Sequence, residues 1–461
     1  MLVNLSLGNQ ALRALCVPAI YQTVSVTIKK PSSMIRGLPQ VMYLRHVKTL
    51  YIWTTHSWER MARKHYLVVQ GSLQLSRCKF KEMKNLQKIV LYDLKIPRWF
   101  QKYIYSLASL TTLEILWCFW PAYPLPKPNF RLESLKVIFS ESSTLDLELV
   151  DACRDTLATL QLNNHAFSSL DIAKIIDCPP PALTHLKVTV SHDPDTNVQI
   201  SRLLAACSTL IHLTIAEYTR RPHAITIEPG ALPNLERFEG PVWYLEPIMR
   251  GGLRPIHTYR QQQWVLGSPH LEDEVIEGIR LLGSSANVIQ ELQLDIFEGS
   301  SAKYAAEEKA LHALVPHLKK WYINLSYSAS VSLLDPCRNA WVLILGLQVW
   351  PFFLIPLLLQ ATNLEHLSIS IQREKYDIWL WSLRVVHDLN SAILFGWLCI
   401  QSCRNLHSLV IVPPISSRTT EIVFEKVAEQ EWVVVAPADS FPHPDGPYSE
   451  YRMIGRTLKP L

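Results

Sequence analysis

Cysteine and histidine are the residues of this sequence whose side chains are best suited to metal binding or redox chemistry. The 461 residues include nine cysteines and 16 histidines, but no two cysteines are spaced as C-x-x-C and no histidine shares the cysteines' spacing. Four cysteines precede the central residue of a short apolar pattern by six to eight positions, namely Cys153, Cys178, Cys207 and Cys403. We expect these four to be small buried side chains in a core, and we expect no metal and no cofactor.

The patterns that usually position nucleophiles, phosphates or a catalytic zinc are missing from the sequence. It contains no G-x-x-x-x-G-K-[ST] loop, no G-x-S-x-G elbow and no H-E-x-x-H pair. We therefore expect a protein that is not an enzyme. Dispersed, unpaired cysteines and the lack of a secretory signal predict an intracellular location, cytoplasmic or nuclear. A net charge of +5 is small for this length and does not indicate nucleic acid as a partner.

The elements that must position any site come from a repeated apolar pattern, L-x-x-L-x-L, in which other apolar residues sometimes replace leucine. From Ile89 to Phe238, successive central residues are 24, 22, 25, 26, 27 and 25 positions apart. This period is typical of a leucine-rich repeat, which has one strand and one helix in each unit. The copies begin at Val47, Leu86, Leu110, Leu132, Leu157, Leu183, Leu210, Leu235, Ile289, Leu318, Leu364 and Leu406.

Alternating strands and helices predict an α/β leucine-rich-repeat solenoid, curved, with parallel strands on its concave face and helices on its convex face. Leu271, Val275, Ile279 and Leu282 form one apolar helical stripe ahead of a strand, and a helix that includes Leu314 is expected to stop at Pro316. Regular repeats carry Asn or Cys at their ninth position. Only one of six copies does so here, which predicts irregular turns; these residues are Leu94, Cys118, Ser140, His165, Ser191 and Tyr218.

The outward residues of the predicted strands are the candidate binding residues, because aromatic, basic and histidine side chains there suit protein recognition. His185 and His212 fall on adjacent strands, about 5 Å apart, where a pair of solvated histidines is favoured over a shared metal. The candidates are Tyr51, Trp53, Lys88, Tyr92, Lys136, Asn163, His185, Lys187, His212, Asp295, Tyr322 and His366.

Two features resemble the F-box family of leucine-rich-repeat proteins. The pattern C-x-x-L-x-x-L-x-L, which begins at Cys207 and again at Cys403, resembles the cysteine-containing repeats of that family. The segment from Asn9 to Val24 is similar to the closing helix and exit strand of an F-box, although the family's Leu-Pro-x-Glu opening and two earlier helices do not precede it. A capping helix for the first repeat is the alternative. The residues that would contact the adaptor are Leu12, Leu15, Pro18 and Tyr21.

The resemblance implies a protein-interaction scaffold like the substrate-recognition subunit of an SCF-type cullin–RING ubiquitin ligase. Its partners would be an unidentified target protein on the concave face and a Skp-type adaptor. The alternative is a stand-alone leucine-rich-repeat scaffold without a ligase role.

The predicted organisation has three parts. Residues 1–30 form a partial F-box-like or capping helix, residues 31–435 form the solenoid, and residues 436–461 form a C-terminal tail. The solenoid is expected to be irregular at 53–85, 240–288 and 327–361, and residues 253–256 are a candidate degenerate strand in the second of these intervals. Residues 339–362 carry no charge, but Pro351 and Pro356 interrupt them, which favours a buried helix over a membrane span.

Overall fold

A computed structural model describes two compact units, which we treat separately. The first unit comprises Met1–Glu217 with His223–Asn234, and the second comprises Tyr218–Pro222 with Leu235–Leu461. Within them the structure describes residues 10–28, 38–54, 73, 77–121, 125–139, 147–163, 172–190, 194–217, 225–250, 252, 254–261, 272–283, 285, 287–297, 311–327, 357–373, 399–400, 403, 405–412, 422–428, 431–435 and 457–458.

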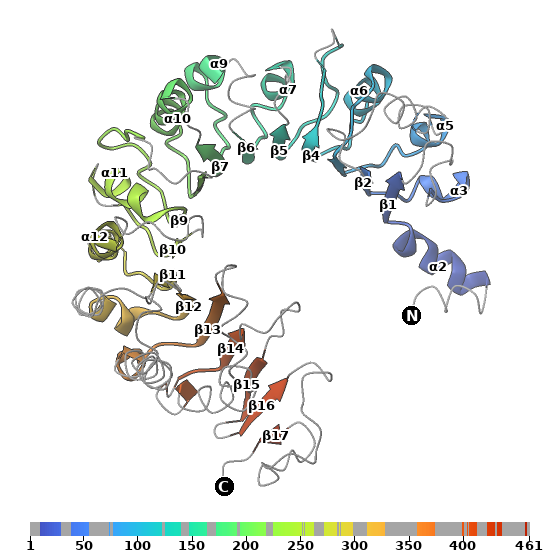
Figure 1. Ribbon diagram of the computed structural model, residues 1–461. Helices are drawn as coiled ribbons and strands as arrows, with labels where there is room; N and C mark the ends of the chain where they lie inside the picture. Colours follow the sequence, from blue (N-terminus) through green and yellow to red (C-terminus); the bar gives the residue numbers. More distant parts are fainter. Residues whose placement is uncertain are drawn as a thin grey trace, which may run out of the picture. The chain divides into compact units, whose positions relative to one another are not determined.

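The described part of the first unit is an open sheet of parallel strands with helices along one side (Figure 1). Each strand pairs in parallel with the next strand in the sequence. The strands are β1 (Thr23–Ile28), β2 (Thr49–Thr54), β3 (Lys88–Tyr92), β4 (Thr112–Cys118), β5 (Ser134–Phe139), β6 (Thr159–Leu162), β7 (His185–Val190) and β8 (His212–Glu217). The helices are α2 (Gln10–Ile20), α3 (Val41–Leu44), α5 (Arg77–Lys81), α6 (Arg98–Tyr105), α7 (Leu147–Ala152), α9 (Ile172–Asp177) and α10 (Pro194–Ala206).

The repeated apolar pattern sets the register of this sheet. Central residues of successive copies face each other across the strands, for example Leu160 with Leu186 and Leu186 with Leu213. These leucines are buried, whereas the residues on either side of each leucine along its own strand are directed to the opposite face of the sheet. The prediction of an α/β fold with parallel strands is therefore confirmed in this unit, and the sheet does not close into a barrel.

The second unit has the same strand–helix alternation, but its last strands pair antiparallel instead of parallel. Strands β9 to β14 pair in parallel, whereas β15, β16 and β17 pair antiparallel. The strands are β9 (Arg237–Glu239), β10 (Thr258–Arg260), β11 (Glu291–Phe297), β12 (Lys320–Tyr327), β13 (His366–Arg373), β14 (Ser408–Val412), β15 (Ile422–Ala428), β16 (Glu431–Val435) and β17 (Thr457–Leu458). The helices are η2 (Val242–Tyr244), α11 (Leu245–Arg250), α12 (Glu272–Leu282) and η3 (Val315–His317).

The long intervals between repeats have two different explanations. β2 pairs directly with β3, and β12 pairs directly with β13. The long interval between the two strands of each pair is therefore spanned by one long repeat without an extra strand. The interval between β9 and β11 instead contains a complete extra repeat with strand β10, built on Ile256, Tyr259 and Gln261. The degenerate strand suggested at residues 253–256 was placed too early, because tyrosine and glutamine stand where the pattern has apolar aliphatic residues.

Two predictions about helices in the second unit have different outcomes. Helix α12 buries Ile279 and Leu282 as the predicted apolar stripe requires, whereas Leu271 and the side chain of Val275 lie outside the described residues. Pro316 does not stop a helix ahead of the strand as expected; it lies inside η3, at a position where a missing backbone N–H has no cost. Residues 339–356 of the uncharged segment lie outside the described residues. Leu357–Gln360 form a helical turn with Leu357 and Leu358 buried.

Three of the four cysteines expected in the core are there. Cys153, Cys207 and Cys403 are buried, but Cys178 is exposed. Cys178 lies eight residues before the central Leu186, the longest of the four spacings, and Pro180 is the buried residue of this connection. The Cys178 thiol instead accepts a hydrogen bond from the Arg154 guanidinium at 3.0 Å.

Polar side chains link successive repeats at a position that the sequence analysis did not consider. The residue before the first apolar residue of a copy donates a side-chain hydrogen bond to a backbone carbonyl of the preceding repeat. The donors and their acceptor residues are Asn85 to Arg45, Ser109 to Leu86, Thr156 to Leu132, Thr209 to Leu183 and Asn234 to Ser208 in the first unit, and Asn363 to Pro316 and Asn405 to Thr362 in the second. These bonds satisfy backbone carbonyls in the turns that precede the strands.

Candidate functional site

The outward side chains of the first unit form rows that run across its strands. One row contains Lys88, Thr112, Ser134, Thr159, His185 and His212. The next row contains Tyr51, Val90, Glu114, Lys136, Gln161, Lys187 and Thr214. A third row begins with Trp53, Tyr92 and Leu116. The parallel register thus brings most of the predicted residues of this unit onto one face.

Aromatic side chains gather on β2, β3 and β4. Trp53 and Tyr92 are register partners and are 41% and 43% exposed. Trp117 is 45% exposed at an irregularity of β4, where its φ of 55° breaks the strand alternation. Sequence reasoning missed Trp117 because it assumed strict alternation. The Trp53 indole N–H donates to the Thr27 hydroxyl, which holds this ring against β1.

Charged groups continue the face beyond the aromatic side chains. Lys88 Nζ and Glu114 Oε1 are 2.5 Å apart, and Glu114 is in register with Lys136 on the following strand. Both partners of this ion pair are partly exposed, so it adds little to stability and mainly fixes the two side chains. Glu114 is a further site residue that the sequence analysis did not name, although its place in the repeat could have identified it.

His185 and His212 lie together as predicted. They are register partners on β7 and β8, and their ring centroids are 5.3 Å apart with an angle of 74° between the planes. A threonine hydroxyl contacts one nitrogen of each ring, at 2.9 Å for Thr184 with His185 Nδ1 and 3.3 Å for Thr214 with His212 Nε2. The two imidazoles are therefore held in fixed positions.

Asn163 does not belong to this outward face, contrary to the prediction. Its side chain is buried, and strand β6 ends one residue earlier at Leu162. Its backbone N–H still donates to the Val137 carbonyl at 3.2 Å, but the outward alternation does not extend past the last strand residue. The repeat position alone could not reveal where the strand ends.

The second unit has its own cluster of outward side chains, centred on Arg260. The Arg260 guanidinium donates from Nε to Glu291 Oε1 at 2.7 Å and lies 3.8 Å from Glu239 Oε1. Arg237 also pairs with Glu239, through Nε at 2.9 Å. Arg260 is stacked over the Tyr322 ring, 5.5 Å from its centroid. Neither Arg260 nor Glu239 was a predicted site residue.

Tyr322 and His366 extend this cluster, and both were predicted. Their ring centroids are 5.3 Å apart. Burial lowers the pKa of His366 below its ordinary value, and the neighbouring Lys320 lowers it further, although Glu291 opposes the shift. The His366 ring is thus held in its neutral form near neutral pH. Asp295 lies on β11, but its side chain is outside the described residues.

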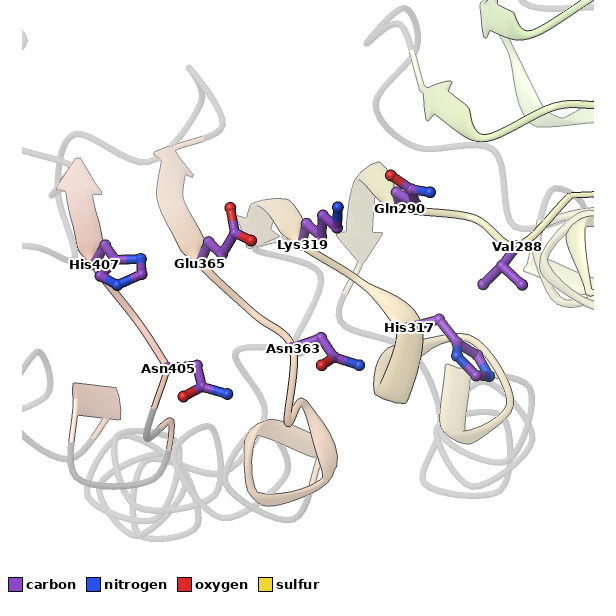
Figure 2. Close-up of a pocket in the computed structure, with 8 residues that line it drawn as sticks. All are labelled: Val288, Gln290, His317, Lys319, Asn363, Glu365, Asn405 and His407. Carbon is purple, nitrogen blue, oxygen red and sulfur yellow. The ribbon is translucent and has the colours of Figure 1, made fainter.

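A polar hollow of about 400 Å³ lies at the start of strands β11 to β14 (Figure 2). Its lining consists of the two residues that flank the first apolar residue in each of four successive repeats. These residues are Val288, Gln290, His317, Lys319, Asn363, Glu365, Asn405 and His407. The Asn363 and Asn405 amides are already engaged in the inter-repeat bonds described above. The remaining basic, acidic and amide groups can form hydrogen bonds to a polar ligand.

The residues in and after helix α2 that were predicted to contact an adaptor differ in their exposure. Leu12 is 40% exposed and Pro18 is exposed. Tyr21 instead stacks on Tyr43, with ring centroids 4.6 Å apart and planes at 4°, so its ring packs within the chain. The side chain of Leu15 is outside the described residues.

Comparisons with known proteins leave this geometry as the main source of functional information. No protein-family model matches the chain, and no curated protein is significantly similar to it. In the described part of the chain, His, Cys, Asp and Glu side chains form no group of three or more that could hold a metal ion. Over the same residues, no helix has both the length and the apolar character needed to cross a membrane.

Proposed function

We propose that this protein is a leucine-rich-repeat solenoid that acts as a protein-interaction scaffold and binds its target on the outward strand face of the first unit. The observation that carries the proposal is the exposure of Trp53 and Tyr92 on adjacent strands, on the same face as the charged residues Lys88, Glu114 and Lys136. The repeat spacing and the open parallel sheet support the repeat type.

Large exposed aromatic side chains provide binding energy efficiently. They bury considerable apolar area and have few rotatable bonds to immobilise, so they are enriched among the residues that dominate protein interfaces. The neighbouring lysines and the glutamate provide directional partners for polar groups of a target. An extended target segment that crosses β2 to β5 would contact both kinds of residue.

The experiment compares two matched variants of the full chain. In the face variant, Tyr92→Ala and Lys136→Ala remove outward contacts; in the control, Arg98→Ala and Lys102→Ala alter residues of α6 on the helical side. We expect proteins captured by the wild type to be retained by the control and reduced at least about tenfold by the face variant. The proposed face would be refuted if all three chains captured the same proteins equally and if a captured protein, once purified, bound the three chains with equal affinity.

We further propose that the chain recruits this target to an SCF-type ubiquitin ligase through its N-terminal helix. The supporting observation is that α2 leaves Leu12 exposed and is followed at once by β1, the first strand of the sheet. Co-expression with a Skp-type adaptor tests this role: we expect a complex that Leu12→Glu disrupts. Failure of the full chain to bind the adaptor would favour the stand-alone scaffold. It would not affect the proposed target-binding face, which is tested separately by the face variant.

A further inference from the structure

A basic surface is formed by α3, α5 and the turns that lead into β2 and β3. Residues 44–88 contain ten lysines and arginines but only two acidic residues. In the described segments 38–54 and 77–87, Glu82 is the single acidic residue. The basic residues of these two segments, which we call the basic patch, are Arg45, Lys48, Arg77, Lys79, Lys81 and Lys84.

The register of the sheet brings the two turns of the basic patch together. β2 and β3 pair with Thr49 opposite Lys88, so Arg45 and Lys84 stand at equivalent positions, each four residues earlier. The Asn85 side chain donates to the Arg45 carbonyl at 2.8 Å, which holds the two turns side by side. Helix α5 carries three more residues of the patch and lies next to α3 on the helical side of this unit (Figure 1).

The charges of the basic patch are not neutralised by neighbouring carboxylates. In the part of the chain that the structure describes, none of the six basic side chains forms an ion pair. Five of them are exposed, and Lys79 is half-buried. Like charges gathered in this way repel one another, so an anionic partner lowers their electrostatic free energy.

Two exposed apolar side chains stand beside the basic patch. Val41 and Met42 of α3 are 56% and 62% exposed. They precede Arg45 by four and three residues, the spacings at which side chains of a helical segment are neighbours. Exposed apolar side chains next to lysines and arginines are the combination that binds the interface of an anionic membrane.

The side chains of the patch also distinguish between classes of anion. Four of the six are lysines, which act as point charges and can follow mobile headgroups, whereas arginine suits a fixed, bidentate partner. Single-stranded nucleic acids stack their bases on exposed aromatic rings. The nearby rings are already engaged, because the Arg77 guanidinium lies over Trp99, 5.7 Å from its centroid, and Tyr43 stacks on Tyr21.

We propose that the basic patch, together with Val41 and Met42, docks the chain on an anionic lipid membrane. The lysines and arginines attract the anionic headgroups, and the two apolar side chains enter the interface between headgroups and acyl chains. The chain lies on such a membrane and does not span it. This surface is separate from the proposed target-binding face, so lipid binding and target capture succeed or fail independently.

Sedimentation of the full chain with phospholipid vesicles tests the proposal. We expect binding to phosphatidylcholine vesicles with about 30 mol % phosphatidylserine, and much weaker binding to phosphatidylcholine alone. Each basic residue next to an anionic membrane changes the partition coefficient about fivefold, so Lys81→Gln/Lys84→Gln should weaken binding about 10- to 30-fold. Met42→Ser should weaken it at least about threefold, because an apolar side chain no longer enters the interface.

Matched controls remove the same kinds of group elsewhere on the surface. Arg202→Gln/Lys426→Gln removes two positive charges outside the patch, and Val198→Ser removes an apolar side chain that is 59% exposed on α10. Both controls should bind anionic vesicles like the wild type. Urea unfolding checks that every variant keeps its fold. Raising NaCl from about 0.1 M to about 0.5 M should weaken the binding of the wild type, because salt screens exposed charges.

Cys78 offers a test that needs no substitution, since it is exposed on α5 among the residues of the patch. Anionic vesicles should slow its labelling by a water-soluble maleimide. The labelling rate of Cys178, which is exposed outside the patch, should stay the same.

Three results would overturn the proposal. In the first, anionic vesicles do not bind the wild type, or phosphatidylcholine vesicles bind it equally well. In the second, Lys81→Gln/Lys84→Gln binds anionic vesicles as tightly as its charge-matched control. In the third, a soluble polyglutamate peptide or a duplex RNA binds through the patch and vesicles do not, which would assign the surface to an acidic protein or to a nucleic acid.

Discussion

The hydrogen bonds between successive repeats predict a measurable loss of stability when one donor is removed. Thr156 Oγ1 is 2.8 Å from the Leu132 carbonyl and 3.2 Å from the Cys153 carbonyl. Valine has nearly the shape of threonine, so Thr156→Val removes the hydroxyl with little change in packing. The Cys153 carbonyl keeps two backbone N–H donors, from Thr156 and Leu157, whereas the Leu132 carbonyl loses the threonine donor.

The expected cost follows from this single lost bond. A typical intramolecular hydrogen bond contributes about 1 kcal/mol net, and water can reach the partly buried carbonyl. We therefore expect Thr156→Val to lower the free energy of unfolding by about 1 kcal/mol. With a urea slope of about 2 kcal/mol/M, the unfolding midpoint would fall by about 0.5 M.

The matched control is Thr159→Val, three residues later on strand β6. Thr159 is an outward strand residue, and valine is at least as favourable as threonine in a strand. Urea unfolding followed by circular dichroism should therefore separate the two variants, with only Thr156→Val destabilised. Equal midpoints for the two variants would refute the stabilising role of these inter-repeat bonds.

Two further predictions concern the core. Leu160 is fully buried and is in register with both Leu135 and Leu186, so Leu160→Ala should cost about 2–5 kcal/mol in urea unfolding; a cost no larger than that of Gln161→Ala, its outward neighbour, would contradict the assigned face. Burial raises the pKa of the Cys207 thiol to about 12, whereas Cys78 and Cys178 are exposed. Alkylation of the native chain at pH 8, followed by mass spectrometry, should therefore label Cys78 and Cys178 before Cys207, because at that pH on the order of one Cys207 thiol in 10,000 is ionised. Early labelling of Cys207 would contradict its burial.

The sequence predicted those parts of the fold that depend on spacing. The 22- to 27-residue period from Ile89 to Phe238 placed the strands correctly, because each central apolar residue must be buried against its counterpart in the next repeat. The same register predicted the separation of His185 and His212. A pattern of apolar residues is sufficient for both because it fixes the register, which decides which residues of adjacent strands are neighbours.

Features that depend on local chemistry could not be predicted in the same way. The repeat of β10 was misplaced because Tyr259 and Gln261 replace aliphatic residues, although both are buried. Cys178 is exposed because its connection is longer than those of the other cysteines. The apolar pattern also does not predict the antiparallel pairing of β14 with β15, because it specifies which residues face the core but not the direction of the neighbouring strand.

The outward residues of the two units differ in a way that bears on where a partner gains binding energy. In the second unit Arg260 is already engaged by Glu291 and stacked on Tyr322, so a charged partner has to compete with contacts that exist in the free chain. In the first unit the exposed rings of Trp53 and Tyr92 share a face with Lys88 and Glu114, and burying the rings removes apolar area from water without breaking that ion pair. The arginine cluster is therefore better suited to fixing the orientation of side chains, and the aromatic strands β2 and β3 are better suited to supplying affinity. Aromatic and charged residues both occupy ordinary outward positions of the repeat. Their spacing therefore does not distinguish residues that fix orientation from residues that supply affinity, whereas their contacts do.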